Sequence, residues 1–298
     1  MLLILVACSK SEGELFPGEN PGDPSISERS LKTDLRKLAE SSTFKIWLCS
    51  HRGNTQKGIA EGIPENSLKA LDHAIIAGAE IVEIDVRSTL DGVLVLMHDK
   101  TIDRTTNGSG TLSNISYEQL KEYKLKDAKG NVTEESVPTL EEALKQGKGK
   151  IYFNLDIANK DIPVSKIVSL LQRLHMIDET LLYVSTDRNY ASDLQSIDNG
   201  LLLHPMVASS EDITYFTSRL SGIQVLQLST SNAISGVLAK EIREKGLLVF
   251  SNIVGGNDTN MLAGSYSGLV NMINKRVALI QTDYTELADM YLKSKGYR

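Results

Sequence analysis

Two histidines and a set of carboxylates stand at the ends of short apolar runs, where they could carry acid–base and metal chemistry. His51 follows one run and His98 another, while Glu83 and Asp85 lie two positions apart in a third. Residues i and i+2 of a β-strand project from the same face, so both carboxylates would point the same way. Two histidines with a pKa near neutrality can serve as a proton donor and a proton acceptor. The set therefore combines possible proton carriers with possible cation ligands.

A second pair of polar residues repeats this spacing one predicted strand later, at Asn154 and Asp156. Carboxylates packed in an otherwise apolar interior repel one another unless they are protonated or bridged by a cation. Oxygen ligands of this kind suit Mg²⁺ or Ca²⁺ rather than zinc. The alternative is a solvated rim with ordinary salt bridges. Two histidines that converge on the same place favour the cation site.

The elements that must position these residues are strands that alternate with helices from residue 44 onward. Apolar runs span 45–50, 81–86, 151–157, 181–185, 201–207, 223–228, 247–253 and 277–282, with helix-like stretches such as 65–77, 164–175, 233–245 and 286–295 between them. This alternation predicts βαβ units and a parallel sheet. Eight units in roughly 250 residues favour a TIM (β/α)8 barrel, which places its chemistry at the carboxyl ends of the strands. A doubly wound open sheet would alternate in the same way.

One extra run, 93–97, follows 81–86 without a helix, and Asp91-Gly92 lies between the two. Asp-Gly between apolar runs is a strong signal of a β-hairpin. A two-residue turn centred there pairs Leu90 with Val93, Ser88 with Val95, and Asp85 with His98. We therefore expect His98 directly beside Asp85, and an inserted lobe over about 99–137, with a helix near 117–123, at the barrel mouth.

Composition excludes several classes of protein. The 298 residues include 32 Lys+Arg and 38 Asp+Glu, for a formal net charge of −6, with no basic run, which argues against a nucleic-acid binder. No stretch approaches the ~20 apolar residues of a membrane-spanning helix. Only two cysteines, Cys8 and Cys49, are present, so a disulfide framework and a cysteine-built zinc site are excluded. Core packing is the expected role of Cys49, with a catalytic thiol as the alternative.

Residues 1–8 end in Leu5-Val6-Ala7-Cys8 and resemble the lipobox of bacterial lipoprotein signal peptides. The resemblance implies that Cys8 is lipidated and that the protein acts on the periplasmic or cell-surface side of a bacterial membrane. A basic start is missing and the apolar run is short, so a frayed apolar terminus is the alternative. Residues 9–43 predict a flexible linker and a short helix from about Ser27, as N-cap, to Glu40. Contact with a membrane is expected only through Cys8.

Six motifs, read in order, resemble the glycerophosphodiester phosphodiesterase family: His51-Arg-Gly53, Pro64-Glu-Asn-Ser67, Glu83-Ile-Asp85, Asp91-Gly92, His98-Asp99 and Asp103-Arg-Thr-Thr-Asn107. Their order and spacing match across 47–107, and Gln281-Thr-Asp-Tyr284 resembles the last strand of the family. The resemblance implies a TIM barrel over 44–298 with a small inserted lobe after the hairpin. It also implies cleavage of glycerophosphodiesters to glycerol 3-phosphate and an alcohol, with Ca²⁺ or Mg²⁺ at the barrel mouth.

The resemblance also assigns roles to single residues. Glu83 and Asp85 would bind the metal, and His51 and His98 would be the acid–base pair. Arg52 would hold the phosphate, whose geometry the arginine fork matches, and Glu65 would bind near the substrate or support the site. The family mechanism implies that the glycerol 2-hydroxyl attacks first and that water then opens a cyclic phosphate.

The third strand departs from the family pattern. The usual Glu-x-Lys is replaced by Asp156-Ile-Ala158, so Asp156 keeps the third metal-binding carboxylate with a shorter reach. The lysine that faces the phosphate is lost at Ala158, and Lys160 is the candidate to replace it. The seventh strand ends Phe250-Ser-Asn252 instead of carrying the usual Trp. These changes bear on substrate choice more than on reaction class.

The sequence thus predicts a metal-dependent phosphodiesterase that acts on small glycerophosphodiesters such as deacylated phospholipid head groups. The nearest rival is a lysophospholipase D or another phospholipase-like phosphodiesterase, which an apolar groove from 108–137 would favour. The loss of lysine at Ala158 motivates a third hypothesis, a non-catalytic binding module. The pair His51 and His98 argues against it, because binding alone does not need two proton carriers.

Other polar residues of the motifs have a simpler interpretation as structural groups. His73, His175 and His204 are expected to be structural. Asp99 and Asp103 would brace the first turn of the lobe. Asn66 or Ser67 would be an N-cap for the helix that follows.

Overall fold

The structure is a computed structural model that describes residues 29–160 and 162–298. The lipobox 1–8 with Cys8 and the predicted N-cap Ser27 lie outside the described residues. The helix expected at this end, α1, spans Leu31–Glu40, and its N-cap is Ser30, whose hydroxyl accepts the backbone N–H of Thr33.

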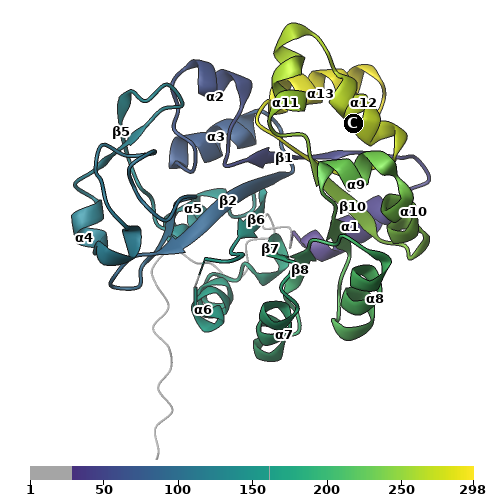
Figure 1. The fold of residues 1–298 in the computed structure, drawn as a ribbon, viewed down its shortest axis with the longest axis horizontal. Coiled ribbons are helices and arrows are strands. Elements are labelled where there is room, and N and C mark those ends of the chain that lie inside the picture. The colour runs from purple at the N-terminus through teal and green to yellow at the C-terminus, as the bar shows by residue number, and fades with distance from the viewer. Residues whose placement is uncertain (1–28, 161) are drawn as a thin grey trace, which may run out of the picture.

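Eight parallel strands form a nearly closed barrel with helices around it (Figure 1). The strands are β1 (Trp47–His51), β2 (Ile81–Ser88), β6 (Tyr152–Asp156), β7 (Thr180–Ser185), β8 (Leu202–Pro205), β9 (Val225–Gln227), β10 (Leu248–Asn252) and β11 (Leu279–Thr282). Hydrogen bonds join them in the order β8-β7-β6-β2-β1-β11-β10-β9. A parallel bridge between Met206 and Gln227 brings β8 back to β9. The TIM-barrel prediction is therefore confirmed, and the open doubly wound sheet is excluded.

The helices between the strands follow the predicted alternation. They are α2 (Gln56–Ala60), α3 (Leu68–Ile76), α5 (Leu140–Gly147), α6 (Val164–Leu174), α7 (Arg188–Ile197), α8 (Ser210–Arg219), α9 (Thr230–Ser235), α10 (Val237–Glu244), α11 (Gly256–Thr259), α12 (Ser267–Asn274) and α13 (Thr285–Ser294). The single helix expected over 233–245 is wrong. Gly236 has φ +78°, a left-handed conformation that ends α9 and starts α10 in a new direction.

The expected register of the β2–β3 hairpin is also wrong, by one residue. Strand β3 (Leu94–Leu96) pairs with β2 through Val86↔Leu96, Arg87↔Val95 and Ser88↔Leu94. The turn holds one residue more than a two-residue turn, and Gly92 takes the left-handed position with φ +81°. As a result Met97 N–H donates to the Asp85 carbonyl, and His98 lies beyond the paired residues instead of opposite Asp85.

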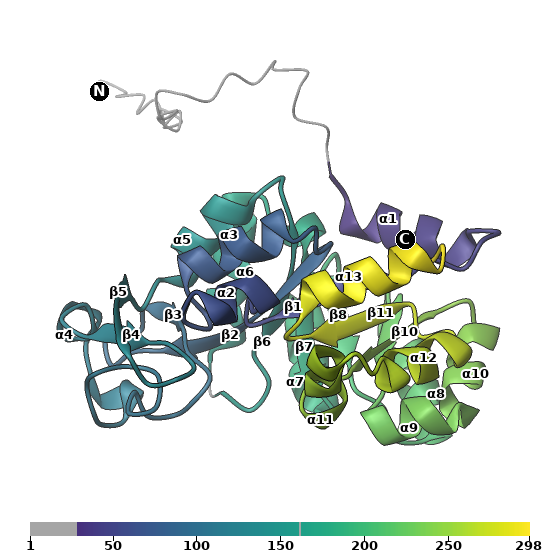
Figure 2. The same ribbon diagram turned by 90° about the horizontal axis from the view of Figure 1, so that it is seen from above.

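The segment from Asp99 to Val137 contains η1 (Leu112–Asn114), α4 (Tyr117–Leu120), β4 (Lys124–Lys126) and β5 (Val132–Ser136). The two strands pair with each other and add nothing to the barrel. Figure 2 shows α4, β4 and β5 together at one end of the molecule, beside β2 and β3. A separate apolar cluster holds this segment: Val95, Met97, Ile102, Leu112, Leu120, Leu125 and Val137. Its predicted place over the barrel mouth stays a prediction.

Helix α1 closes the amino end of the barrel. Leu31 and Leu35 are fully buried, and they share one cluster with residues that begin the strands: Ile81, Tyr152, Leu202, Val225, Leu248 and Leu279. The Tyr152 hydroxyl donates to Asp34 at 2.7 Å. Cys49 lies in the same cluster with no exposed surface, which confirms its packing role. The carboxyl end is therefore the end left for a site. Within the described residues, none of the helices has both the length and the apolar content needed to cross a bilayer.

Because α1 is joined to the barrel mainly by two leucines, Leu35→Ala should lower the free energy of unfolding by about 2–5 kcal/mol, the usual cost of emptying a buried leucine site. Urea denaturation would measure the loss. The control is Lys37→Ala on the exposed face of the same helix, where an ion pair with Asp34 is worth at most ~1 kcal/mol. Equal losses in both variants would contradict the packing of α1 against the barrel.

Candidate active site

A polar cavity of ≈210 Å³ opens at the carboxyl ends of the strands. Its lining residues are His51, Arg52, Glu83, Asp85, His98, Asn154, Asp156, Tyr183, Met206, Gln227, Asn252 and Gln281. Six of the eight site residues predicted from the sequence are among them. The other two, Glu65 and Lys160, stand behind the lining and form ion pairs with Arg52 and Asp85 respectively. The structure therefore brings the whole predicted set together.

The carboxylates meet because β2 and β6 are neighbours in register. Glu83 pairs with Asn154 and Asp85 with Asp156 along the two strands. One oxygen from each of Glu83, Asp85 and Asp156 lies within 4.8 Å of the others, so this cluster could hold a metal ion. Burial, with the charge of Asp85 beside it, raises the pKa of Glu83 to about 8. A donor set made only of carboxylate oxygens fits a hard divalent cation such as Mg²⁺ or Ca²⁺.

Asp85 is the most heavily compensated of the three carboxylates. Lys160 Nζ lies 2.6 Å from Asp85 Oδ1, and Arg52 Nε lies 3.2 Å from Asp85 Oδ2. Asn66 adds a two-way contact, because its Nδ2 donates to Asp85 Oδ2 at 2.9 Å and its Oδ1 accepts the Asp85 N–H. Burial alone would raise the pKa of Asp85, but Lys160 and Arg52 hold it far below its usual range.

Lys160 reaches the carboxylates through a tight turn after β6. Asn159 has φ +56°, and the Ala158 N–H donates to Asp156 Oδ1 at 3.0 Å. This turn carries the chain back, so that Lys160 Nζ lies 3.2 Å from Asp156 as well as touching Asp85. The sequence assigned Lys160 to the phosphate; in the structure its ammonium group lies between two predicted metal ligands.

The His51-Arg52-Gly53 motif makes a sharp turn at the end of β1. Arg52 and Gly53 both have left-handed backbones, with φ +54° and +72°. A Cβ on Gly53 would stand 2.9 Å from the backbone of Ala70 in α3, so the turn needs glycine there. The Arg52 N–H donates to Glu83 Oε2 at 3.1 Å, which ties the turn to the acidic cluster. The cost of a left-handed arginine, of order 1–3 kcal/mol, is typical of a functional site.

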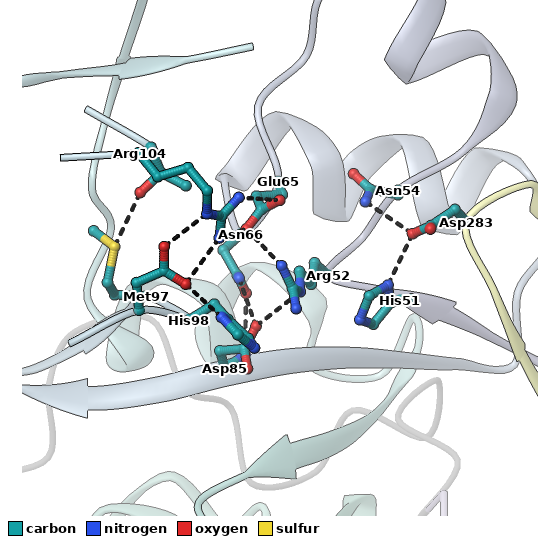
Figure 3. A network of polar contacts seen from close by, with 12 residues as sticks. His51, Arg52, Asn54, Glu65, Asn66, Asp85, Met97, His98, Arg104 and Asp283 are labelled. Atoms are coloured by element: carbon teal, nitrogen blue, oxygen red, sulfur yellow. Dashed lines mark hydrogen bonds and ion pairs between the residues drawn. The ribbon is translucent and has the colours of Figure 1, made fainter. Parts of the chain in front are cut away.

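His51 is held by a carboxylate from the last strand of the barrel. Its Nδ1 lies 2.8 Å from Asp283 Oδ1, which also accepts a hydrogen bond from Asn54 Nδ2 (Figure 3). The pKa of Asp283 is lowered despite its burial, so its carboxylate is ionised and accepts the proton of His51 Nδ1. His51 Nε2 then lies on the side of Glu83, 3.9 Å from Oε2. Burial opposes the charge on His51, but Asp283 and Glu83 together raise its pKa above 6.5.

Asp258, in the short helix α11, supports Asp283 from behind. It accepts hydrogen bonds from the Thr282 hydroxyl and, at 2.6 Å, from the Asp283 N–H. The side chain has no exposed surface, and burial raises the pKa of Asp258 to about 7. Asp258 fixes the backbone of Asp283 and thereby the carboxylate that orients His51.

His98 is held in the same manner from the opposite wall. Its Nδ1 lies 2.6 Å from Asp99 Oδ1, and the guanidinium of Arg104 binds both oxygens of Asp99 (Figure 3). Arg104 also binds both oxygens of Glu65, which in turn accepts Arg52 Nη1 at 2.9 Å. Arg104, helped by His98, lowers the pKa of Asp99 to about 2. One chain of charged contacts therefore links His98 to Arg52.

Sequence reasoning gave no site role to Asp99, Arg104, Asp258 and Asp283. Signals existed for three of them, because Asp283 ends a quoted strand motif, Asp99 follows His98 directly, and Arg104 lies in the last of the six motifs. Asp258 had no signal, since only the fold brings α11 to the end of β11. The bracing role expected of Asp103 is confirmed by its bond from the Gly110 N–H at 3.0 Å.

The structural interpretation of the motif residues is partly confirmed. Ser67 is the N-cap of α3, with its hydroxyl accepting the Ala70 N–H, whereas Asn66 binds Asp85. His204 is fully buried, lies 3.2 Å from Asn154 Oδ1, and contacts Phe250 edge to face. Burial lowers the pKa of His204 to about 3, so it stays neutral.

A TIM barrel with a charged cavity at the carboxyl ends of its strands has the architecture of a large class of enzymes. Residues 51–251 match the sequence profile of the "Glycerophosphoryl diester phosphodiesterase family". The chain belongs to this family, as its motifs predicted.

Individual relatives agree with the family. A stretch of 107 residues is 42% identical to "Glycerophosphodiester phosphodiesterase 1" of Mus musculus, covering 34% of this chain and 30% of the mouse protein, so the match spans less than a third of that relative. A crystal structure of a glycerophosphoryl diester phosphodiesterase from Parabacteroides distasonis superposes with a TM-score of 0.75 at 26% identity, covering 89% of this chain and 92% of that one. A phosphodiesterase of Oleispira antarctica, solved with its product sn-glycerol-3-phosphate, has the same fold, with a TM-score of 0.67, 20% identity, and 84% and 98% coverage.

If Asp283 orients His51, Asp283→Asn should lower kcat/KM by at least about tenfold, because a misplaced base or acid loses much of its contribution. Removal of the negative charge also lowers the pKa of His51, so the limb of the pH–rate profile that His51 controls should move to lower pH. Steady-state kinetics between pH 5 and 9 would measure both effects.

The matched control is Glu286→Gln. This carboxylate lies three residues further along and accepts the N–H groups of Gln56 and Lys57 at the start of α2, away from both histidines. An unchanged profile in Asp283→Asn, or the same shift in Glu286→Gln, would contradict the role of Asp283.

The Arg104 fork should matter because it holds two carboxylates at once. In Arg104→Lys a single ammonium cannot reproduce both bidentate contacts, so kcat/KM should fall ~10-fold or more as His98 and Arg52 lose their fixed positions. Arg173→Lys is the control, since Arg173 binds Glu141 in a similar fork outside the barrel. Equal kcat/KM for the two variants would show that the charged contacts from His98 to Arg52 do not contribute to activity.

Proposed function

We propose that the protein hydrolyses glycerophosphodiesters to glycerol 3-phosphate and an alcohol, with a divalent cation at Glu83, Asp85 and Asp156. The observation that carries the proposal is the pair of histidines in one cavity, each with Nδ1 held by an ionised carboxylate. This arrangement leaves both Nε2 atoms available for proton transfer, which a binding protein does not require.

The charges around the cavity suit a phosphodiester. When bound, Mg²⁺ or Ca²⁺ supplies positive charge to the phosphate oxygens and stabilises the charge that develops on them. Arg52 lines the cavity and would bind the phosphate through the part of its guanidinium that is not engaged by Glu65 and Asp85. Glu65 keeps Arg52 in place, and Lys160 would add a second positive group near the phosphate.

In each half of the reaction, one histidine would accept a proton from the attacking oxygen and the other would donate a proton to the leaving oxygen. In the first half, one takes the proton of the glycerol 2-hydroxyl while its oxygen attacks phosphorus, and the other gives a proton to the departing alcohol. A cyclic glycerol phosphate results. In the second half the roles reverse, and water opens the ring to glycerol 3-phosphate. This order of steps follows the resemblance to the family. The raised pKa of His51 suits the proton donor of the first half.

The size and lining of the cavity favour small, deacylated diesters over lipids. Its ≈210 Å³ leave little room for an acyl chain, and among the described residues none of 108–137 lines it. Leu112, Leu120, Leu125 and Val137 of that segment are instead buried in their own cluster. The rival, a lysophospholipase D or phospholipase-like activity, would need an apolar groove there.

We also propose the location that the lipobox implies: the periplasmic or cell-surface side of a bacterial membrane, with Cys8 as a lipid anchor. The supporting observation is the apolar run that ends at Cys8. Metabolic labelling with a radioactive fatty acid would test it, with label lost in Cys8→Ala.

The proposed activity predicts release of glycerol 3-phosphate from glycerophosphoglycerol or glycerophosphocholine, measured by a coupled dehydrogenase assay. EDTA should abolish release and Mg²⁺ or Ca²⁺ should restore it. His51→Ala should lower kcat by about 10²-fold or more. His73→Ala, on helix α3, is the control and should keep activity.

Two outcomes would contradict parts of the proposal. If no glycerophosphodiester is cleaved with either metal, the binding module becomes the better account. Undiminished release in EDTA would instead remove the cation from the proposed site.

A further inference from the structure

A second cavity of ≈490 Å³ lies next to the candidate active site. Its lining residues are Arg87, Ser88, Thr89, Leu90, Lys100, Thr111, Leu112, Ser113 and Lys160. They come from the outer end of β2, the turn after it, the segment that follows His98, and the turn after β6. Of the eight site residues predicted from the sequence, Lys160 alone lines this cavity.

The two cavities share a wall. Lys160 lines the second cavity, while its Nζ lies 2.6 Å from Asp85, which lines the first. Arg87 Nε donates to the His98 carbonyl at 2.7 Å, so Arg87 lies directly beside the second histidine. A group bound in the second cavity is therefore next to the reacting centre.

Strand geometry places the second cavity in line with the predicted metal ligands. Glu83, Asp85 and Arg87 are alternate residues of β2 and project from one face. Each step of two residues along a strand is about 7 Å, so Arg87 follows Asp85 at roughly the span of a small alcohol. The charge changes sign along this face, from two carboxylates to a guanidinium.

The charge of the second cavity is opposite to that of the first. Arg87, Lys100 and Lys160 are cationic, and four further lining residues carry hydroxyls: Ser88, Thr89, Thr111 and Ser113. The described lining residues include no Asp or Glu. Lys160 is compensated by Asp85 and Asp156, whereas no described carboxylate forms an ion pair with Lys100. Such a surface attracts an anion and repels a quaternary ammonium group.

We propose that this cavity binds the alcohol part of the diester and selects leaving alcohols that carry a second phosphate. Lys100 is the specificity-determining side chain, supported by Arg87 and the hydroxyls around it. The proposal rests on the proposed function, because it names the substrate class of the same site. Diesters with a choline group would be the disfavoured substrates.

Three diesters test the proposal. Cleavage of bis(glycerophospho)glycerol releases an alcohol that carries a second phosphate. Cleavage of glycerophosphoglycerol releases glycerol, without that phosphate, and cleavage of glycerophosphocholine releases a cationic alcohol. The measured quantity is the ratio of kcat/KM for the first two substrates, corrected for the two scissile bonds of the larger one. This ratio should be about 10 or more at low salt and fall as salt screens the charges. Glycerophosphocholine should have the lowest kcat/KM.

Lys100→Glu should lower the ratio by about tenfold, since reversal of the charge turns attraction into repulsion. Because the ratio is taken within one variant, a general loss of activity cancels. Lys150→Glu, an exposed lysine next to the amino end of β6, is the matched control and should leave the ratio unchanged. Arg87 is not the residue to replace, because its bond to His98 would confound the result. A thermal melt of each variant checks the fold.

Inorganic phosphate distinguishes a substrate subsite from a site for the free anion. If the cavity binds the second phosphate of the substrate, added phosphate should inhibit cleavage of bis(glycerophospho)glycerol in the wild type more than in Lys100→Glu. Equal kcat/KM for the two glycerol substrates, or a ratio that Lys100→Glu does not change, would overturn the proposal. Failure of the proposed function is a different result, in which none of the three diesters is cleaved.

Discussion

The repulsion among buried carboxylates at one end of the barrel is the constraint on which the site depends. Glu83, Asp85 and Asp156 place oxygens within 4.8 Å of one another because β2 and β6 lie in register. Charges so close in a poorly hydrated interior need positive partners. Lys160 and Arg52 compensate Asp85, while Glu83 is left with a pKa raised to about 8. A divalent cation among these oxygens would offset the repulsion that raises the pKa of Glu83 and would favour its ionised form.

The positions of the two histidines also depend on charged and hydrogen-bonded neighbours, which extend beyond the cavity lining. Each is oriented through Nδ1 by an ionised carboxylate, and each carboxylate is itself fixed by a neighbour, Asp258 behind Asp283 and Arg104 behind Asp99. The two supports differ chemically, since one is a buried acid and the other an arginine fork. The two imidazole rings thus have different surroundings, as the proposed roles of one proton donor and one proton acceptor require.

The sequence was informative where local chemistry decides the structure. Alternating runs located all eight barrel strands, and the motif His51-Arg-Gly53 marked the turn that Gly53 makes possible. The sequence failed where one residue or a distant contact decides. Gly92 in a left-handed conformation moved the hairpin register by one, and Gly236 broke an expected helix. Asp258 could not be foreseen, because its contacts with Thr282 and Asp283 exist only once α11 folds against β11.

Calorimetric titration of the metal-free protein with Mg²⁺ and with Ca²⁺ tests the central claim most directly. The charge argument predicts one bound cation for each chain and a loss of at least about tenfold in affinity in Glu83→Gln, which keeps the shape of the side chain but removes its charge. The control is Glu80→Gln, three residues earlier in the chain, whose carboxylate pairs with Arg298 outside the cavity. Absence of binding, or equal affinity in wild type and Glu83→Gln, would contradict the account.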